Sequence, residues 1–182
     1  MTPNARTFGR SEPYRSYMRL IFSVTLAMVA AGSALASDVG TIRAHGIALN
    51  VPHGWHRVQA AGDGPVTDPR TLLVVGTAGA RSKPTQCQIA SYRVPIGGAV
   101  VVIVGWKTAT SGGGHMKPGR WPLARLTSVR RPSFECFAGR GAVASLALGG
   151  KAYQVNVMVG KFASDRQISE ALAVARSFRL AS

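Results

Sequence analysis

Residues 142–159 read AVASLALGGKAYQVNVMV, and this stretch predicts a β-hairpin. Gly149 and Gly150 lie between two runs of alternating apolar residues, and a Gly-Gly pair suits the two-residue turns that need positive φ angles. Such a turn places Leu146 opposite Tyr153, and the pairs on either side of them continue one apolar face. A slip of one residue would mix the two faces, so the turn and the pattern predict the same register.

A helix is predicted directly after the hairpin. Residues 164–167 read SDRQ, a capping box in which the serine hydroxyl accepts from the backbone three residues on and the glutamine reaches back. Ile168, Leu172 and Ala175 then recur at helical spacing and give the helix one apolar face. Residues 178–180 follow as a short extended piece or a packed tail.

Several upstream segments predict further strands. Residues 71–77 and 99–106 contain continuous apolar runs, which are typical of central strands buried on both faces. Residues 133–138 and 88–94 read as further strands, and residues 42–51 read as a first strand pair or one bent strand. The chain therefore predicts an α+β domain with an antiparallel-rich sheet of about five to seven strands and a C-terminal helix. One helix cannot cover both faces of such a sheet, so we expect a second covering layer, which the periodicity leaves unassigned.

The N-terminal residues predict an export signal. Arginines precede an apolar run over residues 20–31, and residues 34–36 read ALA, the small-x-small pattern of a cleavage site. The run is short for a membrane span, which needs about 20 apolar residues. We expect residues 1–36 to be removed after Ala36, which leaves a secreted or envelope-associated domain over residues 37–182. The alternative is an uncleaved membrane anchor.

The two cysteines, Cys87 and Cys136, both lie in the exported part. An even number of cysteines in an oxidising compartment favours one disulfide. The loop that the disulfide closes has about 50 residues. In the chain-entropy description, such a disulfide stabilises the folded state by on the order of 4 kcal/mol. The alternative is two buried free thiols.

The chain is strongly basic. It carries 22 Lys and Arg against 7 Asp and Glu, a net charge of +15, and the part after Ala36 keeps about +12. For an exported protein this charge favours anionic envelope polymer or lipid headgroups as partners, and not nucleic acid. The candidate anion-binding residues surround one tryptophan and are Lys117, Arg120, Trp121, Arg125, Arg130 and Arg131. The alternative is a solvated loop whose arginines reflect composition.

The sequence offers few groups for catalysis. His53 and His56 form the closest histidine pair, but the further ligands of a metal site are missing nearby, so we expect no metal and no cofactor. Ser111 and His115 share a glycine-rich loop, which suits the preorganisation of a nucleophile and a base poorly. A non-catalytic binding or accessory protein is the first hypothesis. The alternatives are an envelope-directed hydrolase using His53, His56 or His115, and a small-molecule carrier with an apolar cavity.

The order of segments resembles a group of uncharacterised small secreted proteins from high-GC Gram-positive bacteria. The points of likeness are Gly54-Trp55, Pro95, Gly98-Ala99, Arg131-Pro132, Cys136-Phe137, Gly150-Lys151 and Ala163-Ser164. More distantly, the extended segment that ends in Gly-Trp and the closing helix are similar to the PsbP-like α/β/α sandwich. The resemblance covers most of residues 40–180. The first group has no assigned activity, and proteins of the second are mostly non-enzymatic accessory and binding proteins. The resemblance therefore implies a fold and very little function, and it transfers no catalytic residues.

Overall fold

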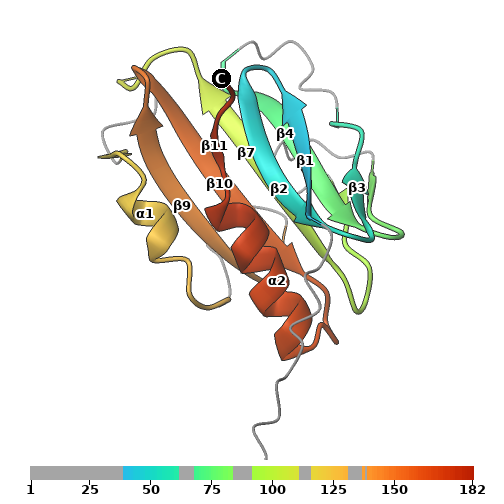
Figure 1. The fold of residues 1–182 in the computed structure, drawn as a ribbon. Coiled ribbons are helices and arrows are strands. Elements are labelled where there is room, and N and C mark those ends of the chain that lie inside the picture. Colours follow the sequence, from blue (N-terminus) through green and yellow to red (C-terminus); the bar gives the residue numbers. More distant parts are fainter. Residues whose placement is uncertain (1–38, 62–67, 84–91, 111–115, 131–136, 138) are drawn as a thin grey trace, which may run out of the picture. The chain divides into compact units, whose positions relative to one another are not determined.

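A six-stranded β-sheet forms the centre of the fold (Figure 1). The computed structural model describes residues 39–61, 68–83, 92–110, 116–130, 137 and 139–182. In spatial order the strands are β3 (Trp55–Arg57), β4 (Arg70–Thr77), β7 (Ala99–Trp106), β10 (Lys151–Val159), β9 (Arg140–Leu148) and β8 (Lys117–Pro118). All neighbouring pairs are antiparallel except β8 and β9, which run parallel, so the sheet is mixed.

The β9–β10 hairpin has the predicted register. Lys151 pairs with Leu148 and Tyr153 pairs with Leu146 across the two-residue turn. The turn glycines have φ angles of 56° and 74°, in the left-handed region that side chains with a Cβ adopt with difficulty. The prediction from the Gly-Gly pair is therefore confirmed.

The two continuous apolar runs are central strands, as predicted. β7 is buried from Ala99 to Gly105, and it lies between β4 and β10. Its side chains alternate between the two faces, so Val101 and Ile103 enter one core cluster while Val100 and Val102 enter another. Both faces of the sheet are thus apolar at their centre, and each needs a cover.

The first face of the sheet is covered by helix α2 (Asp165–Arg176) and by a second, three-stranded sheet. That sheet consists of β1 (Val39–Ala44), β2 (Ile47–Pro52) and β11 (Arg179–Leu180). Figure 1 shows α2 and the β1–β2 hairpin in front of the central strands. Ile47 and Leu49 of β2 and Phe178 beyond α2 are fully buried in this layer. Residues 42–51 therefore form a strand pair and not one bent strand.

Helix α2 begins at the predicted capping box. The Ser164 hydroxyl accepts a hydrogen bond from the backbone N–H of Gln167 at 3.3 Å, and the Gln167 side chain accepts from the backbone N–H of Ser164 at 2.8 Å. Ile168, Leu172 and Ala175 are buried, so the predicted apolar face is the one that packs on the sheet.

The second face of the sheet carries a smaller core cluster around Val74, Val102 and Met158. Its described cover includes the short pair β5 (Arg81–Ser82) and β6 (Tyr92–Arg93). Of the strand predicted over residues 88–94, only the end is described, and it contains β6. The strand predicted over 133–138 lies outside the described residues except for Phe137, which is in no strand.

The described part of residues 108–132 contains regular structure, although the stretch is rich in glycine and proline. Their described part includes β8 and helix α1 (Trp121–Ala124), which starts with a proline in its first turn. Leu123 and Leu126 lie three residues apart and are both buried in the first core cluster. Because the surrounding glycines and prolines are typical of a loop, the sequence did not predict this short helix.

The N-terminal prediction and the cysteine pair lie outside the described residues, so the export signal and the disulfide stay predictions. Among the helices that the structure describes, none has the length and apolar character to cross a membrane.

Candidate functional site

The described residues carry far more cations than acids. They contain seventeen Lys and Arg against three Asp and Glu, and no ion pair forms within this part of the chain. Two of the carboxylates accept other hydrogen bonds, Glu170 from the indole N–H of Trp55 and Asp68 from the backbone N–H of Lys107. The positive charge of the described residues is therefore not neutralised by ion pairs with described carboxylates, and it raises the potential at their surface.

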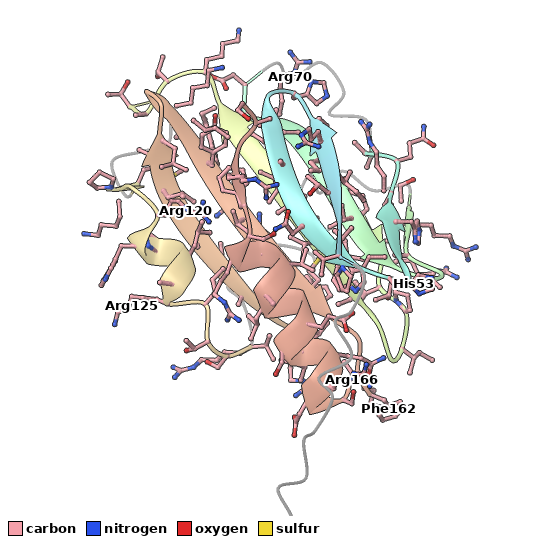
Figure 2. All side chains as sticks on the ribbon, viewed as in Figure 1. His53, Arg70, Arg120, Arg125, Phe162 and Arg166 are labelled. Atoms are coloured by element: carbon pink, nitrogen blue, oxygen red, sulfur yellow. The ribbon has the colours of Figure 1, made fainter. Side chains whose placement is uncertain are left out.

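Part of the predicted basic segment gathers around helix α1. Trp121 begins the helix with 60% of its surface exposed. The guanidinium carbon of Arg125 lies 4.6 Å from the centroid of the Trp121 ring, a cation–π contact between residues one helical turn apart. Lys117 and Arg120 precede the helix and are exposed, and Figure 2 shows Arg120 and Arg125 beside α1. We call these four residues the Trp121 surface.

The other arginines of the segment have different positions. Arg130 forms an isolated backbone bridge to the start of β9, and Arg131 lies outside the described residues. Arg120 also has a structural contact, because its Nη2 donates to the carbonyl oxygen of Arg176 at 3.0 Å. In return, Nη1 of Arg176 donates to the carbonyl oxygen of Leu126 at 2.6 Å. These bonds attach α1 to the last turn of α2, where free carbonyl groups attract cations.

A second cationic site, which the sequence did not reveal, is an open pocket of about 850 Å³ beside the second face of the sheet. Its described lining residues are Lys83, Tyr92, Arg93, Val94, Phe137, Gly139, Arg140, Val159, Gly160 and Lys161. We call it the basic pocket. Four of these side chains are cationic, and no carboxylate is among the described lining residues. Tyr92, Val94 and Phe137 also pack in the second core cluster, so the pocket joins a charged part to an apolar part.

The wall of the basic pocket that carries Lys161 is held by backbone hydrogen bonds. Gly160 donates to the carbonyl oxygen of Gly98 at 2.8 Å, and Phe162 donates to that of Ile96 at 2.9 Å. A Cβ atom on Gly160 would overlap the carbonyl oxygen of Pro95, so only glycine permits this close approach. The end of β10 is therefore fixed against the segment before β7, and this contact sets the place of Lys161.

The two described histidines of the hydrolase hypothesis, His53 and His56, do not line one cleft. His53 shares an open cleft of about 540 Å³ with Ser164 and Glu170, whereas His56 does not line that cleft and His115 lies outside the described residues. Ser164 is bonded in the helix cap and Glu170 is bonded to Trp55. Within the described ranges, no hydrogen bond joins His53 to either group, and no three potential metal ligands from His, Cys, Asp and Glu cluster together.

A smaller hollow of about 330 Å³ lies near the other end of β10. It is lined by cations from several segments but also by Asp68, so its charge is mixed. Tyr153 contributes to its wall, and burial raises the pKa of the Tyr153 hydroxyl above the ordinary value. The carboxylate makes this hollow a poorer anion site than the basic pocket.

The chain matches no protein-family model and no curated protein. Its function is therefore argued from the chemistry of these sites.

Proposed function

We propose that this chain is a secreted, non-catalytic binding or accessory protein that attaches through its basic surface to anionic polymer or lipid headgroups of a cell envelope. The observation that carries the proposal is the set of seventeen Lys and Arg, none of which is in an ion pair with a described carboxylate. Cations without nearby counter-charges attract polyanions over several ångströms. The predicted export signal and the resemblance to small secreted proteins support the same setting.

The distribution of the charge favours contact with an extended anionic surface. Figure 2 shows labelled arginines at separate places, with Arg120 beside α1, Arg70 near one end of the sheet and Arg166 at the start of α2. A Lys or Arg near an anionic membrane contributes about 1 kcal/mol, so several cations are needed for firm attachment. A broad basic surface supplies that number without a deep site.

Two exposed aromatic side chains lie next to cations. Arg125 stacks on Trp121, and the Nζ atom of Lys161 lies 5.2 Å from the centroid of the Phe162 ring, a ring that is 69% exposed. Aromatic rings beside cations suit the boundary between headgroups and water, where one side is apolar and the other is charged. These pairs support binding to envelope material more than they support a purely soluble role.

The proposal is tested by retention of the protein on vesicles at low salt. We expect sedimentation with vesicles that contain phosphatidylglycerol and none with phosphatidylcholine alone, because only the first attracts the unpaired cations. An insoluble anionic cell-wall polymer is a parallel arm that separates polymer from lipid as the target. The proposal would be contradicted if the protein bound neither of the two anionic materials. It would also be contradicted if retention on phosphatidylcholine vesicles equalled retention on phosphatidylglycerol vesicles.

A further inference from the structure

We propose that the basic pocket is a specific site for a molecule with a phosphate group on an apolar body. This inference rests on the proposed function, because it names the anionic chemistry that one site recognises. It differs from general attachment in that four cationic residues line a single hollow, although Nη2 of Arg140 also donates to the carbonyl oxygen of Ala163 at 3.4 Å. The pocket of about 850 Å³ also lies within the size range of ordinary small-molecule sites.

The charged part of the pocket favours phosphate over carboxylate. Lys83, Arg93, Arg140 and Lys161 come from four places in the chain and line one hollow with no described carboxylate among them. A phosphate monoester carries about −1.5 to −2 charges and three acceptor oxygens, whereas a carboxylate carries one charge and two oxygens. Arginine forks match phosphate oxygens in pairs, and lysine adds point charges. Four cations are therefore better matched by a phosphate.

The apolar part of the pocket indicates that the phosphate carries an organic body. Phe137 and Val94 are half-buried, so each keeps some apolar surface beside the hollow, whereas Tyr92 is already almost fully buried and only supports them from behind. Covering apolar and aromatic surface with an apolar ligand removes that surface from water and stabilises the complex. Inorganic phosphate has no apolar part that could cover it. The body can belong to a lipid or to a soluble phosphorylated molecule, since both present the same chemistry.

Calorimetric titration of the full chain tests the site with defined probes. We expect naphthyl phosphate to bind at least about tenfold more tightly than inorganic phosphate, because only naphthyl phosphate covers the apolar wall. Octanoate, a carboxylate with an apolar chain, should bind more weakly than naphthyl phosphate. Dioctanoyl phosphatidic acid in place of naphthyl phosphate tests the lipid source. Equal binding of naphthyl phosphate and inorganic phosphate, or tighter binding of octanoate, would overturn the assignment.

A charge-matched pair of double variants separates the site from the overall charge. Arg93→Gln with Lys161→Gln removes two pocket cations, and Arg57→Gln with Arg166→Gln removes two exposed cations that do not line the pocket. We expect the first double variant to weaken naphthyl phosphate binding about tenfold and the second less than about twofold. All four side chains are exposed, and thermal unfolding of both double variants, measured before the titrations, checks that each of them is folded.

The outcomes for the pocket and for the proposed function are distinguishable. If both double variants weaken naphthyl phosphate binding equally, or if neither does, the pocket is not the site, although retention on anionic vesicles can still stand. If the protein is retained neither on the vesicles nor on the polymer, the proposed function fails. This result does not depend on the titration with naphthyl phosphate. Loss of naphthyl phosphate binding confined to the pocket variant supports the inference.

Discussion

Burial changes the acid–base chemistry of Tyr153. Its side chain is almost fully buried, and its ring lies 5.2 Å from that of Phe178, centroid to centroid, at an angle of 56°. Burial penalises the charged phenolate, so the pKa of Tyr153 is raised above the ordinary value of about 10. The neutral hydroxyl is therefore part of the folded state.

This raised pKa predicts a loss of stability at alkaline pH. Below about pH 10 both states hold the proton and the contribution of Tyr153 is fully present. Above that pH the unfolded chain ionises first, so the free energy of unfolding falls until the folded pKa is reached. Tyr153→Phe cannot ionise, and we expect it to lose less stability than the native chain between about pH 8 and about pH 11 in urea unfolding. An equal decline in both proteins would contradict this prediction.

Some individual residues could be assigned from the sequence because their roles are local. Gly149, Gly150 and Ser164 act on backbone groups within three residues of themselves, and their predicted roles are confirmed. Arg93 and Arg140 could not be assigned to a site. They are 47 positions apart, and nothing in either neighbourhood indicates that both line one pocket.

At the scale of elements, helix α2 depends on its cap as well as on its buried face. Ser164 satisfies one of the otherwise free N–H groups of the first turn, and Gln167 completes the reciprocal bond. The helix covers the centre of the first face of the sheet. Residues at its start, among them Ser164 and Gln167, also line the cleft that contains His53.

The capping box gives a prediction with a control in the same helix. Ser164→Ala removes the side-chain acceptor, and we expect the free energy of unfolding to fall by about 1 kcal/mol in urea titrations. Ser169 is exposed within α2, so Ser169→Ala should be neutral or slightly stabilising, because alanine is the better helix former. Equal effects of the two substitutions would show that the cap bond contributes nothing.

Elements with local signals were predictable, whereas their long-range pairing was not. The hairpin, the cap of α2 and the apolar runs of β4 and β7 each follow from a few neighbouring residues. The pairing of β11 with β2 and the parallel pairing of β8 with β9 join segments that are distant in the chain. Register of that kind is decided by tertiary packing, so only helix α2 of the first-face cover could be predicted, and the three-stranded sheet beside it could not.

At the scale of the molecule, charge was predictable but its concentration into a pocket was not. Composition alone gives a net charge of +15 and indicates anionic partners. Part of the predicted basic segment gathers at helix α1, where Arg125 forms a cation–π pair with the exposed Trp121 and other exposed cations lie nearby. The basic pocket is formed by the fold, which brings residues 83, 93, 140 and 161 to one hollow. The predicted Cys87–Cys136 disulfide lies outside the described residues and stays a prediction.

The most direct test of the central claim is the affinity of the full chain for phosphatidylglycerol vesicles as salt is raised from about 50 to about 300 mM. We predict that the logarithm of the binding constant falls steeply with the logarithm of the salt concentration, because each contact between a cation and a headgroup releases counterions and added salt opposes that release. Arg57→Gln with Arg166→Gln should reduce both the affinity and the slope. An affinity that does not change with salt would contradict the claim that unpaired cations hold this protein to anionic material.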